Sequence, residues 1–217
     1  MNLVVLGATG RTGRLVVERA LAAGHTVTAL VRSPEKLAIR NSNLRVVAGQ
    51  ATDAADVARA MIGADAVIST LGGSGSVIVD STRAIVEAAH KTGVKRVIVL
   101  SSFLVERDRM GALSRLITGL ASRSEMEDKK AGEQLLRQSD LDWTISYPGP
   151  LTDAPATGFV GVLPEGTKRR ISERISRADV AGWLVEAATS HQTSRRGIDI
   201  TGGARTKKPP KNAVRVD

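Results

Sequence analysis

Ten residues near the start of the chain, Val-Val-Leu-Gly-Ala-Thr-Gly-Arg-Thr-Gly, constrain the fold more than any other segment. The apolar residues up to Leu6 predict a buried strand, and the glycines after it predict a turn into a helix. Gly7 can adopt a tight turn, Gly10 keeps a Cβ away from an approaching ligand, and Gly13 lets the helix pack close to the strand. The chain is therefore expected to begin with a strand, a glycine turn and a helix.

This spacing predicts a site for the pyrophosphate of a dinucleotide. The first turn of the helix offers free backbone N–H groups and the positive end of the helix dipole, and both favour a diphosphate. We expect Thr9, Arg11 and Thr12, which complete the turn, to lie at the cofactor too. Many strand-to-helix turns need a glycine for geometry alone, but three glycines at this spacing favour the binding site.

The end of the second predicted strand indicates which dinucleotide is preferred. A helix over 11–23 stops at Gly24, a strand follows over 25–31, and Arg32 and Ser33 come next. Sites selective for NAD usually have an acidic residue here, whereas an arginine can bind a 2′-phosphate with two hydrogen bonds. The sequence thus predicts NADP, with NADPH preferred over NADH. Solvated surface arginines are the alternative interpretation.

Strands and helices alternate along the rest of the chain. Predicted strands cover 44–47, 64–69, 94–100, 143–146 and 197–201, and predicted helices cover 52–60, 79–91, 125–138 and 176–188. This alternation predicts an α/β fold of the Rossmann type, a doubly wound and mainly parallel sheet with helices on both faces. Ligands of such sheets bind beyond the carboxyl ends of the strands, where Leu71, Gly72, Ser101 and Ser102 fall.

We expect one domain over residues 1–204, with a substrate region built from segments after about residue 101. Residues 205–217 are basic, polar and rich in proline, and we expect them to form a flexible tail. The sequence does not indicate the oligomeric state.

Composition excludes several classes of site. The chain has no cysteine, so disulfides and thiolate chemistry are excluded, and three histidines far apart in sequence predict no metal site. No apolar run approaches the ~20 residues that span a bilayer, and no targeting segment is evident. We therefore expect a cytoplasmic protein without a membrane partner.

Positive charge gathers near the end of the chain. Residues 165–217 carry a net charge of +6, out of +9 for the whole chain. A basic surface can bind nucleic acid, but aromatic residues make up only 2% of the chain, which leaves few stacking platforms for bases. Nucleic acid is thus an improbable partner, and a solubilising basic face is the simpler interpretation.

Six segments together resemble a known family. They are residues 7–13, 31–33, 66–72, 97–102, 141–149 and 175–181. The chain resembles an atypical short-chain dehydrogenase/reductase of the NAD(P)-binding, NmrA-like and biliverdin/flavin reductase-like group. The resemblance implies that the glycines contact the pyrophosphate of the cofactor, Arg32 its 2′-phosphate, and Leu71 and Gly72 the middle of the dinucleotide. Ser101 or Ser102 is expected on the nicotinamide side, and Pro148 at the carboxamide region. We expect Tyr147 and Gly149, on either side of Pro148, to contact the cofactor too.

The sequence also departs from the family pattern. Ketone-reducing members commonly place a tyrosine four residues before a lysine, as proton donor. Lys129 matches the lysine, but Glu125 occupies the tyrosine position, and Tyr147 cannot replace it by spacing. Gln50 stands where the family often has an aspartate near the adenine. Lys129 is expected either at the cofactor ribose or as a solvated helix lysine.

These departures indicate the kind of acceptor. Flavins and quinones delocalise the charge that a hydride brings and can take a proton from water, whereas simple ketones need a proton donor. The sequence therefore predicts an NADPH-dependent reductase of a flavin-like, quinone-like or other conjugated small molecule. Ser101, Ser102 and Lys129 are its candidate catalytic residues. The alternatives are a catalytically silent NADP(H)-binding regulator and, less favoured, a nucleic-acid-binding module.

Overall fold

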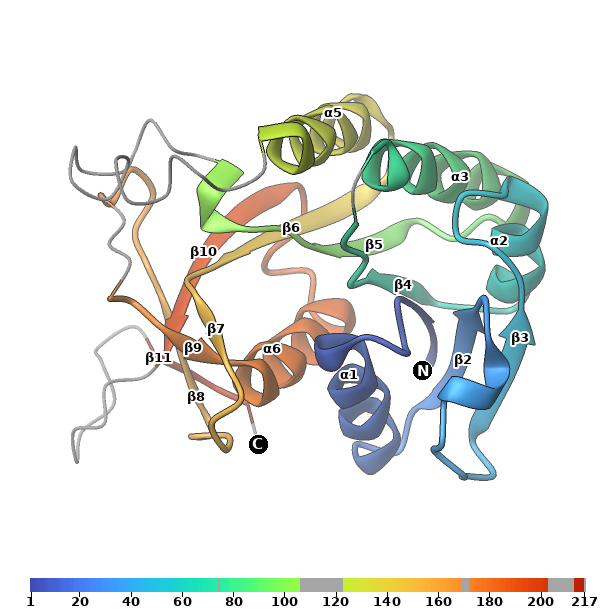
Figure 1. Cartoon of the computed structure of the whole chain (residues 1–217), viewed down its shortest axis with the longest axis horizontal. Helices are drawn as coiled ribbons and strands as arrows, with labels where there is room; N and C mark the ends of the chain where they lie inside the picture. Colours follow the sequence, from blue (N-terminus) through green and yellow to red (C-terminus); the bar gives the residue numbers. More distant parts are fainter. Residues whose placement is uncertain (74, 106–122, 169–171, 203–212, 217) are drawn as a thin grey trace.

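A computed structural model describes residues 1–73, 75–105, 123–168, 172–202 and 213–216 (Figure 1). Within these residues a nine-stranded sheet has the order β11-β8-β10-β6-β5-β4-β1-β2-β3. Its strands are β1 (Asn2–Leu6), β2 (Thr26–Val31), β3 (Leu44–Ala48), β4 (Ala66–Ser69), β5 (Arg96–Leu100), β6 (Asp142–Pro148), β8 (Phe159–Val162), β10 (Arg196–Gly202) and β11 (Ala213–Arg215). Two short strands, β7 (Leu151–Thr152) and β9 (Ile175–Ser176), pair in parallel outside this sheet.

The sheet is mainly parallel. From β3 to β10 every neighbouring pair of strands is parallel, and only β8 runs against its neighbours β10 and β11. Leu3 of β1 lies beside Val27 of β2 on one side and Ala66 of β4 on the other. The central strands are almost entirely aliphatic because both of their faces are covered by helices. The predicted Rossmann-type α/β fold is confirmed.

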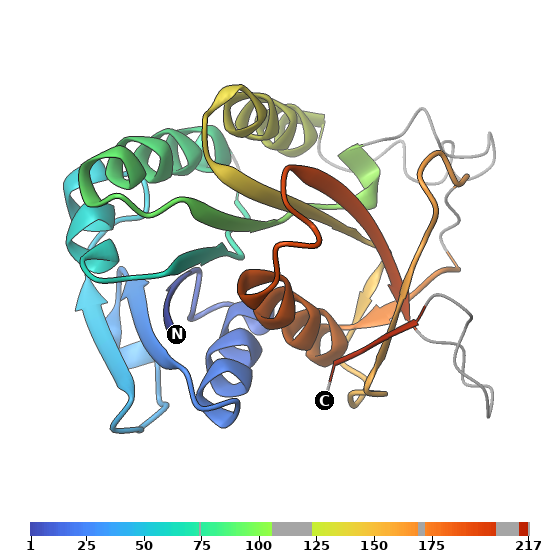
Figure 2. The ribbon, with the colours of Figure 1, turned by 180° about the vertical axis from the view of Figure 1, so that it is seen from behind.

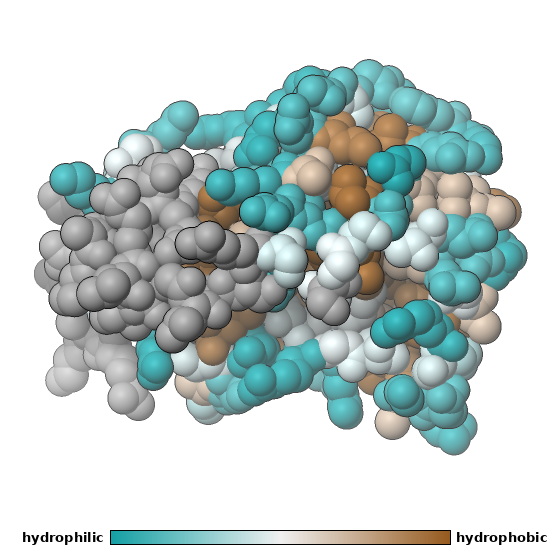
Figure 3. Space-filling model, turned by 45° about the horizontal axis from the view of Figure 1, so that its top comes forward, coloured by the Kyte–Doolittle hydropathy of each residue, from teal (hydrophilic) through white to brown (hydrophobic). Residues whose placement is uncertain are grey.

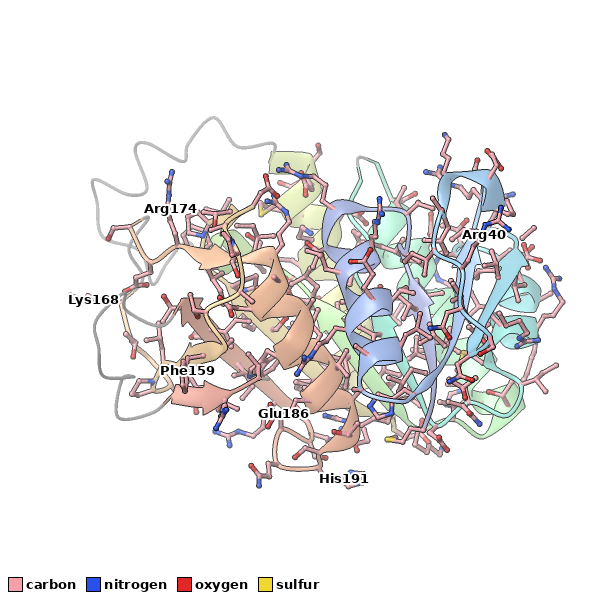
Figure 4. The ribbon with its side chains drawn as sticks, turned by 90° about the horizontal axis from the view of Figure 1, so that it is seen from below. Arg40, Phe159, Lys168, Arg174, Glu186 and His191 are labelled. Atoms are coloured by element: carbon pink, nitrogen blue, oxygen red, sulfur yellow. The ribbon has the colours of Figure 1, made fainter. Side chains whose placement is uncertain are left out.

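Helices cover both faces of the sheet (Figure 2). One face carries α1 (Arg11–Ala22) and α6 (Arg177–Thr189), which pack side by side (Figure 4). The other carries α2 (Ala54–Met61), α3 (Val77–Thr92) and α5 (Arg123–Gln138), and a short 3-10 helix (Pro34–Lys36) follows β2. Alternate residues of β1 serve the two faces: Leu3 and Val5 pack toward α1, Val4 and Leu6 toward α2 and α3.

Two helices begin at side-chain caps. The Asp53 side chain accepts hydrogen bonds from the backbone N–H groups of Ala55 and Asp56 at the start of α2. Ser176 accepts from the N–H of Asp179 at the start of α6. Each cap satisfies N–H groups that a helix leaves without a partner in its first turn. These two N-termini are thus closed by their own side chains.

The end of the chain differs from the expected tail. Residues 213–215 form β11 against β8, and Val216 is buried beside α6. The Val216 carbonyl accepts from Arg19 Nη2 at 3.0 Å, and its N–H donates to the Gly158 carbonyl at 3.0 Å. The prediction of a flexible tail over 205–217 is therefore wrong for residues 213–216, because the open edge of β8 supplies a pairing partner. Residues 203–212 and 217 lie outside the described part of the chain.

Two surface properties bear on possible partners. None of the described helices has the length and apolar character needed to cross a membrane. Figure 3 shows one face on which hydrophilic side chains predominate, with hydrophobic side chains gathered in a patch between them.

Candidate functional site

A pocket of about 650 Å³ lies beyond the carboxyl ends of β1, β4, β5 and β6. Its walls are formed by Gly10, Arg11, Thr12, Thr70, Leu71, Gly72, Leu100, Ser101, Ser102, Phe103, Leu104, Glu125, Met126, Lys129, Pro148, Gly149, Pro150, Leu151 and Arg177. Between β1 and β4 the strand order reverses, and this is where open α/β sheets bind ligands. The volume is in the ~300–1,000 Å³ range of small-molecule sites.

The three glycines of the first turn have different tasks. Gly7 has φ +83°, a conformation that L side chains rarely adopt. A Cβ on Gly13 would lie 2.1 Å from the Gly7 carbonyl oxygen, so no other residue fits without moving the helix. A Cβ on Gly10 would meet only the Gly7 oxygen, at 3.2 Å, and Gly10 lines the pocket. Gly7 and Gly13 therefore build the turn, and Gly10 keeps its surface open to a ligand.

The N-terminus of α1 opens into this pocket. Its N-cap is Gly10, with no side-chain cap among the described residues and no acidic residue in the first turn. Gly10, Arg11 and Thr12 all line the pocket. The first-turn N–H groups and the helix dipole can thus act on an anion bound there. The glycines and this open helix end fit the pyrophosphate of a dinucleotide.

Two arginines and one carboxylate stand together at the edge of the pocket. Arg11 of α1 and Arg177 of α6 both line it, and both form ion pairs with Asp153. Arg177 Nη1 donates to Asp153 Oδ1 at 2.7 Å, and Arg11 Nη2 donates to Asp153 Oδ2. Arg11 thus lies beside the glycine turn, and its charge is paired with that of Asp153. Sequence reasoning missed Asp153 and Arg177, which are distant from Arg11 along the chain.

The residues expected at the far end of the cofactor lie outside the pocket. Arg32 and Ser33 follow the carboxyl end of β2, and Gln50 follows that of β3. Arg32 is exposed and has no hydrogen-bond or ion-pair partner in the described part of the chain. Since β2 lies next to β1, β3 lies next to β2, and all three are parallel, these residues share the edge at which the pocket opens. Thr9, in the glycine turn, is exposed and is not part of the pocket wall.

The opposite wall comes from α5 and the loop after β5. Lys129 and Glu125, one helical turn apart on α5, both line the pocket, with 3.7 Å between Lys129 Nζ and Glu125 Oε1. Lys129 is only 7% exposed, so the interpretation as a solvated helix lysine is wrong. Ser101 and Ser102 lie in the same wall, as do Leu71 and Gly72 after β4 and Pro148 and Gly149 after β6.

Ser101 belongs to a buried hydrogen-bond network behind that wall. Its Oγ donates to Glu133 Oε1 at 2.5 Å, and the Tyr147 hydroxyl donates to Glu133 Oε2 at 2.5 Å. Arg137 Nη1 lies 3.1 Å from the same Oε2, and Arg137 Nη2 donates to the Tyr147 oxygen at 2.5 Å. Burial opposes the charge of Arg137, but Tyr147 and Glu133 beside it raise the pKa of its guanidinium above the usual value.

Tyr147 does not occupy the position expected of it. Its side chain is 2% exposed, packs on the α5 side of the sheet and is absent from the wall of the large pocket. It borders instead a separate pocket of about 240 Å³, together with Arg137 and Asp199. Strand alternation turns residue 147 toward α5, whereas the chain after it bends over the ligand pocket. The expectation that Tyr147 contacts the cofactor is not supported by this placement.

Sequence reasoning also missed Glu133 and Arg137. Lys129, Glu133 and Arg137 follow one another at intervals of four residues on α5, so they lie on one face of the helix. Such a line of charges usually marks a solvated face, but Glu133 and Lys129 are buried. The only signal in the sequence was this spacing. In the described part of the chain no group of three or more acidic, histidine or cysteine side chains could hold a metal.

Comparison with known proteins gives matches over nearly the whole chain. The model of a family described as NAD(P)H-binding matches residues 7–191. An uncharacterised chloroplast protein of Arabidopsis thaliana is 34% identical, and the match covers 95% of this chain and 79% of that protein.

Two solved structures share the fold. ChuY of Escherichia coli, described as an anaerobillin reductase, has a TM-score of 0.78 and 28% identity, covering 97% of this chain and 100% of that one. A short-chain dehydrogenase/reductase of Veillonella parvula, solved in complex with NADP, has a TM-score of 0.78 and 21% identity, covering 97% of this chain and 98% of that one.

Proposed function

The chain belongs to the NAD(P)H-binding family, and from this premise we propose that it is an NADPH-dependent reductase. Its acceptor is a flavin-like, quinone-like or other conjugated small molecule. A solved structure that supports a reductase is that of ChuY, which is described as an anaerobillin reductase.

One observation carries this proposal. The open N-terminus of α1 and an apolar wall face the same pocket, so a phosphate-bearing cofactor and a flat apolar acceptor can lie beside each other. The apolar wall includes Leu71, Leu100 and Met126. Holding hydride donor and acceptor together can lower a barrier by as much as ~7–11 kcal/mol, which gives catalysis without a protein acid.

We assign the cofactor to the glycine side of the pocket. Bound NADPH supplies the hydride. The N–H groups of the first turn of α1 bind its pyrophosphate, while Thr9 borders it and Arg32 with Ser33 binds its 2′-phosphate. Gln50 then lies toward the adenine. Leu71 and Gly72 contact the middle of the dinucleotide.

The other wall receives the nicotinamide end. Lys129 binds the ribose, and its buried ammonium group is held near Glu125. Ser101, Ser102, Pro148 and Gly149 border the nicotinamide and the acceptor.

The acceptor class follows from the titratable groups in the pocket. Glu125 stands at the position of the usual tyrosine and pairs with Lys129, so the described wall offers no phenol to protonate an alkoxide. A conjugated acceptor spreads the negative charge and can take its proton from water. We therefore place simple ketones outside the substrate range.

A turnover screen with matched acceptors tests the proposal. The purified chain is mixed with NADPH, and NADPH oxidation is followed with FMN, menadione or 2-butanone as acceptor. We expect oxidation with FMN or menadione and none above background with the ketone. Tight NADPH binding without turnover of any conjugated acceptor would favour the NADP(H)-binding regulator. Rapid ketone reduction would reveal an acid in the site.

The cellular location stays a prediction. We propose the cytoplasm, in keeping with the absence of cysteine, although the Arabidopsis relative is named as chloroplastic. Neither the family nor the pocket indicates nucleic-acid binding. Fractionation of the source cells with an antibody against the chain tests the location.

A further inference from the structure

We propose that Glu133 fixes the hydrogen-bond polarity of Ser101, so that the pocket requires an N–H or O–H donor on its ligand at this position. The assignment rests on the proposed function, since it concerns the same pocket. It makes Glu133 a positioning residue and Ser101 an acceptor of a hydrogen bond.

The two residues come from different elements and meet under the pocket wall. Ser101 follows β5, and Glu133 lies in the middle of α5. Ser101 is 7% exposed and lines the pocket, while Glu133 is 4% exposed and lies behind it. The distance from Ser101 Oγ to Glu133 Oε1 is 2.5 Å. A ligand in the pocket can therefore reach Ser101 but is separated from Glu133 by it.

The direction of this hydrogen bond follows from its partners. A carboxylate only accepts hydrogen bonds, and a serine hydroxyl has one proton. Glu133 forms an ion pair with Arg137, and its Oε2 already accepts from Tyr147. Ser101 must then give its proton to Oε1, and only the lone pairs of its oxygen remain for a ligand.

This polarity selects among ligands. A carbonyl or carboxylate oxygen placed at Ser101 would face another oxygen without a proton between them, which is unfavourable. An amide NH₂, a ring N–H or a hydroxyl would complete the network. Two sources of such a donor exist in the proposed complex: the carboxamide NH₂ of the cofactor and a ring N–H of the acceptor. In either case Ser101 does not donate a proton to the acceptor.

Cofactor analogues test the first source by binding alone. The 3-acetylpyridine analogue of NADPH keeps the carbonyl group and replaces the NH₂ by a methyl group. By calorimetry without acceptor, we expect the analogue to bind about threefold to tenfold more weakly than NADPH, the worth of one neutral hydrogen bond. In Ser101→Ala the ratio of the two dissociation constants, analogue over NADPH, should fall to about 1, because the hydroxyl that accepts the hydrogen bond is gone.

Glu133→Gln separates positioning from a merely structural role. Tyr147 and Arg137 both donate to the Oε2 side, so the amide oxygen of the glutamine turns there and its NH₂ faces Ser101. Ser101 then accepts from the glutamine and directs its own proton into the pocket. The carbonyl oxygen that both cofactors carry can then accept from Ser101 once the carboxamide of NADPH rotates. We expect the acetylpyridine analogue to bind this variant about as tightly as NADPH, and more tightly than it binds the unaltered chain, a gain that a merely structural disturbance would not produce. The matched control is Glu87→Gln, an exposed glutamate of α3 paired with Lys91, which should leave the ratio as it is.

The second source is tested with acceptors. Lumiflavin carries an N3–H that 3-methyllumiflavin lacks. If the hydrogen-bond donor belongs to the flavin, the unaltered chain should bind NADPH and its acetylpyridine analogue about equally. The KM for 3-methyllumiflavin should then be about threefold to tenfold higher than that for lumiflavin, and Ser101→Ala should remove this difference.

The outcomes separate the two proposals. If Ser101→Ala changes neither the ratio of the two cofactor affinities nor the ratio of the two flavin KM values, the assigned polarity of Ser101 is overturned. NADPH-dependent reduction would remain as proposed. If a folded Glu133→Gln does not bind the acetylpyridine analogue more tightly than the unaltered chain does, while the Ser101→Ala effect is present, the role of Glu133 is overturned. Failure of NADPH to bind would overturn the proposed function and this assignment with it.

Discussion

The two walls of the pocket differ in composition, since one consists mainly of backbone and the other mainly of side chains. The wall after β1 and β4 is mostly backbone: a turn at Gly7, an open surface at Gly10 and the N–H groups of α1. The wall from β5 and α5 is made of side chains held by one another, with Glu133 bonded to both Ser101 and Tyr147. Backbone N–H groups bind the pyrophosphate, which every dinucleotide has. Side chains can be substituted without altering the fold, so the wall from β5 and α5 can differ in ligand preference between proteins of the same fold.

The walls also differ in what they cost the folded state. The glycine turn needs close approach of two backbones, and any added carbon disturbs it. The α5 wall holds its buried Glu133 through side chains, so a substitution of the same shape that keeps the hydrogen bonds, such as Glu133→Gln, changes the chemistry of this wall and leaves the backbone in place. We therefore expect substitutions in the first wall to affect folding and all cofactor binding, and those in the second to affect selectivity and affinity.

The largest effect is expected at Gly13. In Gly13→Ala the new Cβ would lie 2.1 Å from the Gly7 oxygen, so α1 must move away from β1. We expect a loss of about 3 kcal/mol in the free energy of unfolding, measured by urea denaturation. Gly10→Ala is the matched control, with its nearest contact at 3.2 Å and a smaller expected loss. Equal losses at the two positions would contradict the division of tasks within the turn.

A bulky residue at Gly10 should separate binding from folding. Gly10→Val places a branched side chain in the pocket beside the N-terminus of α1, where the pyrophosphate is expected. We predict at least about 100-fold weaker binding of both NADPH and NADH, or about 2.7 kcal/mol, with the circular dichroism spectrum unchanged. A folded variant that binds NADPH as before would remove the basis for placing the cofactor on this wall.

A substitution of Arg32 tests whether a side chain after β2 makes the site beside the backbone wall selective for NADPH. Arg32→Ala should remove a charge-assisted contact worth ~1.5–3 kcal/mol from NADPH binding and leave NADH nearly unaffected. Calorimetric titration of both cofactors measures the difference. Arg40→Ala, another exposed arginine after β2, is the control and should change neither affinity. Loss of affinity for both cofactors alike would show that Arg32 does not discriminate between them.

The smallest effect is expected at Lys129, on the side-chain wall. Lys129→Met keeps the buried aliphatic stem and removes the charge near Glu125. We expect NADPH binding to weaken about fivefold, or ~1 kcal/mol, and the single-turnover rate at saturating NADPH to fall less. Lys130→Met, on the exposed neighbour, serves as control. A larger loss in rate than in affinity would place Lys129 in the chemical step.

The alternation of strands and helices in the first half and the position of the glycine turn follow from the sequence alone. The roles of Gly7 and Gly13 can be predicted because residues close to them along the chain set their geometry. The alternation of apolar strands with helices was sufficient to predict a mainly parallel sheet. Once the order of strands is known, the edge that holds Leu71, Ser101 and Pro148 follows from the carboxyl ends of the strands.

Which side chains meet at that edge depends on how the folded chain brings distant elements together. Ser101 and Glu133 are 32 residues apart, and Arg11 and Asp153 are 142 apart, so no local pattern joins them. The pairing of β11 and the burial of Val216 depend on an edge of β8 that exists only in the folded sheet. Neighbouring residues determine local backbone geometry. The direction of the hydrogen bond of a buried hydroxyl depends instead on a partner that folding brings from another element.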